Sequence, residues 1–125
     1  MSPAAVALGV LLQLAPGGEK LAAPAADLIA RAVDHEAEPE RWAALLAVYV
    51  YRESSMRADA VGDGGRSCGL VQLRCEWTAH LDAEGQLRLW LRLVHASSLG
   101  AVDSSPSRAA RRAELAERLR AKVTP

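Results

Sequence analysis

The sequence predicts an all-α fold, or an α fold with a minimal β-hairpin, made of about five helices. Half of the 125 residues are apolar, and Ala and Leu, both strong helix formers, carry the predicted core. Pro and Gly divide the chain into segments of helical length. No segment alternates convincingly as a strand, although residues 70–74 can pair briefly. A chain of this length fits a single domain, here residues 1–125.

The first two predicted helices cover residues 3–15 and 24–36. Pro16, Gly17 and Gly18 end the first one, because this combination stops a helix. The second is predicted to begin at Pro24, since proline is favoured in the first turn. Its apolar residues share one face at helical spacing: Ala25, Leu28, Ile29, Ala32 and Val33.

The third predicted helix covers residues 39–54 and precedes a loop rich in Gly, Asp and Ser at residues 57–68. The fourth covers residues 83–96 and the last residues 106–123. Ser105 before Pro106 is typical of an N-cap followed by the first helical residue. The Arg and Glu residues of the last helix predict a face in contact with solvent.

Charge and composition exclude several classes of function. Fifteen basic and fifteen acidic side chains cancel, so nucleic acid is not an expected partner, although the last helix is locally basic. The apolar run at residues 4–15 has no basic residue before it and is too short to span a bilayer. It is therefore not a convincing signal peptide, and no membrane insertion is expected.

No metal and no cofactor is predicted. Cys68, Cys75 and His80 do not have the spacing of a standard zinc site, and a fourth ligand is lacking. The two cysteines form a disulfide if the protein is exported, or remain small buried thiols. Trp77 lies on no clear apolar stripe. It is a candidate for stacking on a sugar or for packing in the core.

Glu53 is the leading candidate for a catalytic group. Trp42, Leu45, Leu46 and Tyr49 follow the i, i+3, i+4, i+7 pattern, and the next position of that stripe is Glu53. Burial and the negative end of the helix dipole are expected to raise the pKa of this carboxyl group. A carboxyl group protonated near neutral pH can act as a general acid. In the alternative interpretation it pairs with a base such as Arg52 or Arg57, or lies in water.

The motif around this residue is more specific than its periodicity. Glu53-Ser54 ends the predicted helix, and residues 62–72 read GDGGRSCGLVQ. Together they resemble the lysozyme-like superfamily, in which a Glu-Ser pair ends a helix and a Gly-Leu-Met-Gln motif follows a glycine-rich loop. The greatest similarity is to goose-type lysozymes and related lytic transglycosylases, including those of phages. It covers residues 45–73, with Val71 in place of the usual Met.

The resemblance implies a lysozyme-like helical domain that cleaves the β-1,4 bond between N-acetylmuramic acid and N-acetylglucosamine in peptidoglycan. Glu53 would be the catalytic acid, and Ser54 would orient its carboxyl group or the sugar. Gln72 would line the substrate groove, and Gly69 would let the backbone approach the saccharide. Asp63 would position the attacking water, unless it only stabilises a turn before glycine. At least one of the loop glycines is expected to have positive φ: Gly64, Gly65 or Gly69.

Two departures from the family pattern leave the product open. Arg74 stands where a further goose-type aspartate is expected, and residues 97–100 replace an Asn-Ala-Gly sequence. The expected partner is the glycan strand of peptidoglycan, and a monomer is expected. The expected place of action is the cell wall, reached in the periplasm, outside the cell or by phage delivery. The alternative is a non-catalytic helical module that binds glycan or another phage virion protein.

Overall fold

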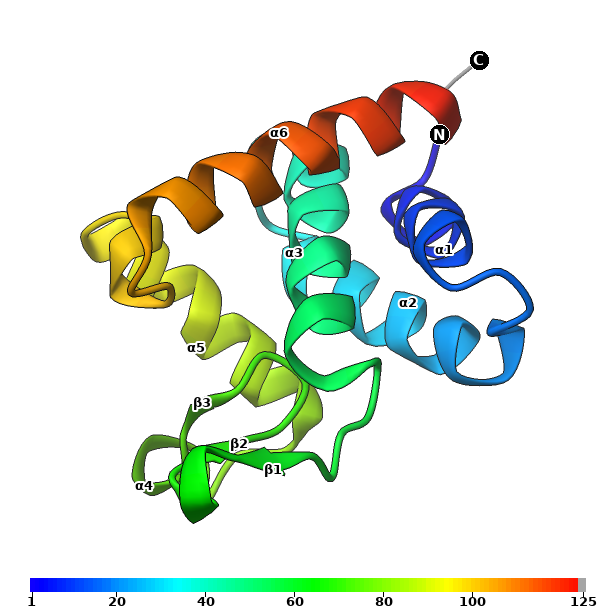
Figure 1. Ribbon diagram of the computed structural model, residues 1–125. Helices are drawn as coiled ribbons and strands as arrows, with labels where there is room; N and C mark the ends of the chain where they lie inside the picture. The colour runs from blue at the N-terminus through cyan, green and yellow to red at the C-terminus, as the bar shows by residue number, and fades with distance from the viewer. Residues whose placement is uncertain (124–125) are drawn as a thin grey trace.

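The computed structural model describes residues 1–123, and within them helices predominate (Figure 1). The helices are α1 (Pro3–Leu14), α2 (Glu19–Val33), α3 (Pro39–Ser54), α4 (Cys75–Thr78), α5 (Ala83–Ala96) and α6 (Pro106–Val123). Three short strands accompany them: β1 (Val61–Gly62), β2 (Ser67–Cys68) and β3 (Leu73–Arg74). Two 3-10 turns, η1 (Asp63–Gly65) and η2 (Leu99–Ala101), complete the described elements. The predicted class, all-α with a minimal hairpin, is confirmed.

Helix α3 lies at the centre of the molecule, in contact with α1, α2 and α6 (Figure 1). Seven of the eight consecutive positions 43–50 of this helix are buried: Ala43, Ala44, Leu46, Ala47, Val48, Tyr49 and Val50. A helix that is apolar on all sides must be enclosed by other elements to be stable. The first turn, which carries Arg41, and the last turn, which carries Glu53, reach the surface.

The core compensates for the lack of phenylalanine with tryptophan and tyrosine. Trp90 of α5 is fully buried. Its ring centroid lies 5.3 Å from that of Tyr49 and 6.5 Å from that of Trp42, the latter in an edge-on arrangement. Such tilted and edge-on pairs suit the charge distribution of aromatic rings. They tie α5 to the central helix.

Helix α2 begins at Glu19, five residues before the predicted start at Pro24, and ends at Val33 instead of residue 36. The prediction was wrong because Pro24 lies inside the helix. Ala22, one turn earlier on the apolar face, is fully buried, so burial extends the helix toward its N-terminus. Pro24 itself is exposed. There water can bond the carbonyl group that lacks its usual N–H donor.

The three strands form an antiparallel sheet in the order β1-β2-β3. Val61 pairs with Cys68, and Cys68 pairs with Leu73. The brief pairing predicted within residues 70–74 is therefore present, at its C-terminal end. The sheet and α4 together lie beyond the C-terminal end of α3 (Figure 1). No helix among residues 1–123 combines the length and the apolar character needed to cross a membrane.

Candidate functional site

The C-terminal end of α3 has a fixed geometry. Ser55 and Met56 both have positive φ, 52° and 67°. The Ser55 N–H donates to the Tyr51 carbonyl at 2.9 Å, and the Met56 N–H donates to the Val50 carbonyl at 3.4 Å. This pattern of bonds closes a helix and turns the chain away from its axis. Glu53 therefore occupies the last turn, immediately before the chain leaves for β1.

The carboxylate of Glu53 pairs with an arginine from the far end of the sequence. Its Oε2 atom lies 3.3 Å from Nη1 of Arg112 in α6, and the Glu53 side chain is 26% exposed. The apolar stripe predicts deeper burial than this. The alternative of an ion pair is confirmed, although the partner is neither Arg52 nor Arg57.

Arg112 belongs to a larger buried network around Asp103. The Asp103 side chain is 1% exposed. It accepts hydrogen bonds from the Tyr49 hydroxyl at 2.8 Å and from Arg108 at 2.6 and 2.9 Å. Arg112 lies 3.8 Å from the same carboxylate and 4.9 Å from the Tyr49 ring centroid. The network connects Glu53 through Arg112 to a rigid, buried anion.

The network changes the titration of two of its members. Burial opposes ionisation of Asp103, but the hydrogen bonds from Arg108 and Tyr49 outweigh it and hold the pKa of Asp103 below its usual value. Burial, together with the bond to Asp103, raises the pKa of Tyr49. No pattern in the sequence singles out Asp103 beyond its place just before the cap of α6. It lies in a loop, where periodicity carries no information.

Asp63 is held within its own loop. It lies in η1 with φ of 52°, and its Oδ2 accepts a hydrogen bond from the Ser67 hydroxyl at 2.5 Å. It lines an open pocket of about 710 Å³ beside the sheet. Glu53 is not among the residues that line this pocket. The structure therefore does not bring the two carboxylates into one pocket, and the contacts of Asp63 favour the turn-forming interpretation.

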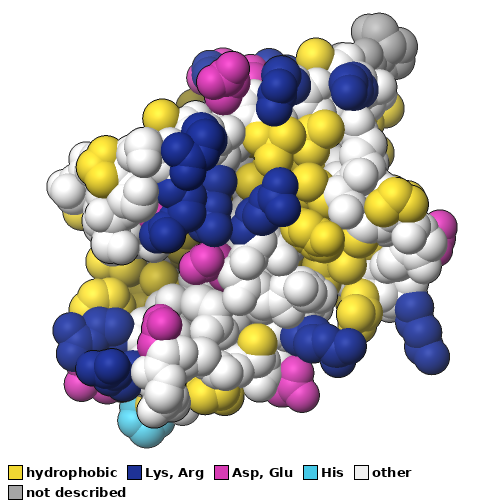
Figure 2. All heavy atoms as spheres, in the orientation of Figure 1, with side chains coloured by type: hydrophobic (Ala, Val, Ile, Leu, Met, Phe, Trp, Pro, Cys, Tyr) yellow, Lys and Arg dark blue, Asp and Glu magenta, His cyan; other side chains and the backbone are white. Residues whose placement is uncertain are grey.

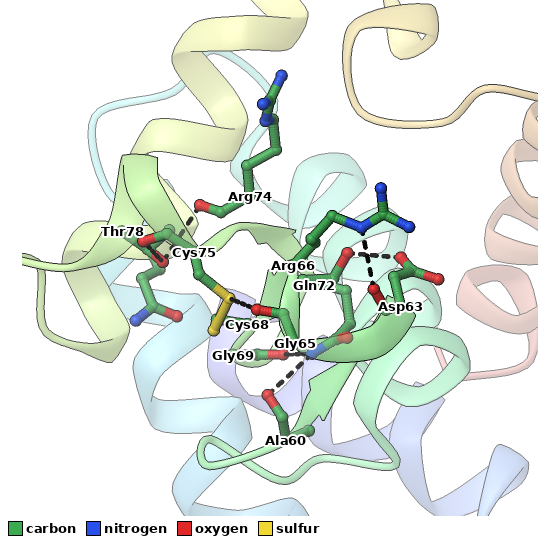
Figure 3. Close-up of a disulfide and its surroundings, with 12 residues drawn as sticks. Ala60, Asp63, Gly65, Arg66, Cys68, Gly69, Gln72, Arg74, Cys75 and Thr78 are labelled. Atoms are coloured by element: carbon green, nitrogen blue, oxygen red, sulfur yellow. Dashed lines mark hydrogen bonds between the residues drawn. A yellow bond between two sulfur atoms is a disulfide. The ribbon is translucent and has the colours of Figure 1, made fainter.

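The side chains of Ser54 and Gln72 make bonds inside the protein. Ser54 is 7% exposed, and its hydroxyl donates to the Val50 carbonyl at 2.9 Å. The Gln72 amide nitrogen donates to the carbonyl groups of Ala60 and Gly69 at 3.0 and 2.9 Å (Figure 3). Both amide hydrogens of Gln72 are thereby used. These contacts favour structural roles, at the helix end and in the loop, over direct contact with a sugar.

The loop glycines confirm the expected backbone conformation. Gly64, Gly65 and Gly69 have φ of 66°, 93° and 87°, which only glycine adopts without strain. The reason why glycine is needed at position 69 differs from the expected one, which was close approach of a saccharide. Gly69 is buried, and a Cβ atom there would lie 1.9 Å from Oε1 of Gln86. Gln86 of α5, and not open space for a saccharide, lies beside this glycine.

Cys68 and Cys75 form a disulfide, which decides between the two alternatives left open by the sequence (Figure 3). It joins β2 to the first residue of α4 and closes the turn that carries Gly69 and Gln72. Neither sulfur is then available as a thiolate ligand. Within residues 1–123, no three His, Cys, Asp or Glu side chains gather as a possible metal site.

Removing this disulfide is expected to destabilise the protein. For a loop of this length, Cys68→Ala/Cys75→Ala should lower the free energy of unfolding by roughly 2 kcal/mol, or about 8 °C in Tm, because the unfolded chain gains freedom. Thermal unfolding followed by circular dichroism measures the change, with reduced wild-type protein as the control. Two titratable thiols in unreduced, unfolded wild-type protein would contradict the disulfide.

Trp77 of α4 does not pack in the core. Its side chain is 45% exposed, and the Arg74 guanidinium lies 5.3 Å from its ring centroid. The core-packing alternative is therefore wrong. An exposed tryptophan beside the pocket of Asp63 offers a flat apolar surface of the kind on which a sugar ring can stack.

The candidate site thus consists of a partly exposed carboxylate at the end of the central helix, with arginines of α6 on one side and the disulfide-closed sheet on the other. Comparisons with models of protein families, with curated proteins and with solved structures each found no match. A carboxyl group in this position can donate and accept a proton, and the neighbouring arginines can bind an anion.

Proposed function

We propose that the protein cleaves the β-1,4 bond between N-acetylmuramic acid and N-acetylglucosamine in peptidoglycan, with Glu53 as general acid and base. One observation carries the proposal. Glu53 occupies the last turn of a buried central helix, keeps its carboxyl group partly exposed, and is followed by a small antiparallel sheet. The glycine turn of that sheet carries the Gly69-Leu70-Val71-Gln72 motif. This order of features supports the resemblance to lysozyme-like enzymes.

The proposed reaction needs only one carboxyl group. Glu53 gives its proton to the glycosidic oxygen as the bond from that oxygen to the muramyl C1 breaks. The muramyl 6-hydroxyl then attacks C1, and its proton passes to the Glu53 carboxylate. The products are a free 4-hydroxyl on N-acetylglucosamine and a 1,6-anhydro muramyl end. No water is consumed, and the carboxyl group returns to its protonated state.

The position of Asp63 favours this route over hydrolysis. Hydrolysis with inversion requires a second carboxylate, about 6.5–9.5 Å from the acid, to activate water. Asp63 already accepts a short bond from Ser67 and lines a pocket that does not include Glu53. Arg74, which replaces the other goose-type aspartate, carries a protonated guanidinium group and cannot take a proton from water. An intramolecular nucleophile makes neither group necessary.

The ion pair of Glu53 with Arg112 favours the second candidate, a module that binds glycan without cleaving it. A general acid must present its carboxyl group to the glycosidic oxygen, and one carboxyl oxygen of Glu53 lies 3.3 Å from the Arg112 guanidinium instead. In the enzymatic proposal, Arg112 must exchange this contact for another when substrate binds. In the binding module the ion pair is permanent.

The disulfide supports action outside the reducing cytoplasm. Structural disulfides persist in oxidising surroundings such as the periplasm or the extracellular space. Cys68 and Cys75 join the two sides of the proposed site's loop. We therefore propose that the protein meets peptidoglycan in the periplasm or outside the cell, or is delivered there by a phage.

Digestion of purified peptidoglycan sacculi tests the proposal. Mass spectrometry of the released muropeptides distinguishes anhydro ends from reducing ends by the mass of one water molecule. The proposed enzyme releases soluble muropeptides with anhydro ends. Protein that sediments with sacculi but releases nothing is instead a binding module, and this result would overturn the proposed cleavage.

Replacing Asp63 with Asn is expected to leave activity within about threefold of wild type. Asn tolerates the positive φ of this position and can accept the bond from Ser67. Rates of muropeptide release from sacculi measure the effect, with Asp59→Asn on the same loop as the control. A loss of a hundredfold, together with reducing-end products, would assign Asp63 to water activation and the reaction to hydrolysis.

A further inference from the structure

Five arginines line one open pocket beside Glu53. The pocket measures about 390 Å³. Its residues come from α3 and α6: Arg52, Arg108, Arg111, Arg112, Leu115 and Arg118. We call it the arginine pocket. Figure 2 shows Lys and Arg side chains gathered over α6 on the face that it presents to the viewer.

This local charge contrasts with the zero net charge of the chain. Helix α6 holds six basic residues and two acidic residues, a net charge of +4. Two of the pocket arginines have carboxylate partners: Arg108 pairs with Asp103, and Arg112 pairs with Glu53. The five guanidinium groups are thus balanced by two carboxylates, which leaves three positive charges.

The remaining arginines are not neutralised inside the protein. Arg111 and Arg118 are exposed and, within residues 1–123, make no hydrogen bond or ion pair. Arg52 only lies over the Tyr51 ring, 5.7 Å from its centroid. Like charges gathered in one place destabilise the folded state by repulsion. Such repulsion between arginines, with no carboxylate in the described part of the fold to offset it, is typical of a binding site.

The guanidinium groups of the pocket are suited to an anion that presents at least two oxygen atoms to one arginine. Guanidinium groups present a planar pair of donors, and this pair matches carboxylate and phosphate. Arg112 also places the pocket next to the reacting group, since it lines the pocket and contacts Glu53. A substrate whose reacting bond lies at Glu53 therefore has the pocket within reach of its neighbouring anionic groups.

We propose that the arginine pocket binds carboxylate groups of the peptide stems that the muramyl units of peptidoglycan carry. The inference rests on the proposed function and adds the peptide stem to the recognised substrate. The bound carboxylate offers Arg112 a partner in place of Glu53 and so releases Glu53 from its ion pair. Phosphate groups of other wall polymers offer the same chemistry, and the experiment separates the two sources.

The test compares three soluble glycan preparations of equal length: peptide-bearing strands, strands stripped of peptide, and stripped strands that carry phosphate. The variant is Arg111→Gln/Arg118→Gln, which removes two unpaired charges. The matched control is Arg57→Gln/Arg92→Gln. This control also removes two exposed charges. Arg57 and Arg92 line two other pockets, each of which includes residues of α2. Kinetics of cleavage give kcat and KM for each pair of protein and strand.

The pocket variant should raise KM for peptide-bearing strands by about tenfold, the scale of one lost charge-assisted hydrogen bond. It should leave stripped strands unchanged, and the control variant should match wild type on both. Arg111→Lys/Arg118→Lys should recover part of the loss, because charge returns without the planar donors. Equal KM values for pocket variant and control on peptide-bearing strands would overturn the inference. So would an effect confined to phosphate-bearing strands.

Direct binding separates failure of this inference from failure of the proposed function. Wild-type protein that cleaves none of the strands overturns the function. Isothermal titration with an uncleaved peptide-bearing disaccharide then still tests the pocket: weaker binding by the pocket variant alone supports it, and equal binding by both variants overturns it. Single-stranded DNA is the second ligand of the titration. Loss of DNA affinity in the pocket variant, with muropeptide affinity unchanged, would identify a nucleic-acid site and overturn the proposal.

Discussion

Replacing Glu53 with Gln is expected to slow the cleavage of peptidoglycan by at least about a hundredfold, the usual scale of general acid catalysis. Gln keeps the shape of the side chain and can still accept the bond from Arg112, but it has no proton to give to the leaving oxygen. Muropeptide release from purified sacculi, followed over time by mass spectrometry, measures the loss.

The matched control is Glu40→Gln, in the first turn of the same helix. It should cleave at the wild-type rate. The stability of Glu53→Gln should change by less than about 1 kcal/mol, since partly exposed ion pairs contribute little. An unchanged cleavage rate in folded Glu53→Gln would remove this residue from the mechanism. Undiminished binding to sacculi alongside a lost rate would place its role in the chemical step.

Replacing Asp103 with Ala is expected to lower the free energy of unfolding by roughly 3 kcal/mol. The change removes the buried acceptor of Tyr49 and the partner of Arg108, and leaves an arginine and a hydroxyl without compensation. Urea unfolding followed by circular dichroism measures the difference. Asp59→Ala, at an exposed position of the loop after α3, is the control and should stay within about 0.5 kcal/mol of wild type.

The contribution of Asp103 should also depend on pH in a defined direction. The pKa of Asp103 is lower in the folded protein than in the unfolded chain, where Asp titrates at about 3.9. The folded state therefore binds this proton less readily. The stabilisation is fully present above pH 4 and is lost as the pH falls through the folded-state pKa. Wild type and Asp103→Asn should approach each other in stability below about pH 4. An equal difference at pH 7 and pH 2 would contradict the lowered pKa.

Local signals were sufficient for most of the helices. Helices α3, α5 and α6 have the predicted bounds, residues 39–54, 83–96 and 106–123. Each begins at a residue with a local start signal: Pro39 and Pro106 open two of them. Asp82 caps the third, where its side chain accepts from the Gly85 N–H at 2.7 Å. Caps and prolines act within one turn of the chain, and a sequence displays them directly.

The same signals failed where packing opposed them. Pro24 is a start signal by its type, yet the buried face of α2 begins with Ala22 and includes Pro24 in the helix. Helix α4 has only four residues, and the disulfide joins its first residue, Cys75, to Cys68 of β2. In both cases the contacts that determine where the helix forms are made with other parts of the chain.

The sequence by itself determined the helical class, the position of Glu53 at the end of a core helix, and the positive φ of the loop glycines. Each depends on spacing or on a residue type within a few positions. Only the tertiary structure decided what surrounds Glu53. Its partner Arg112 lies 59 residues later in the chain, Asp103 connects to it from a loop, and α6 brings four arginines beside Arg52. These neighbours depend on how α6 crosses α3, and that packing is set by the whole core, which no local pattern encodes.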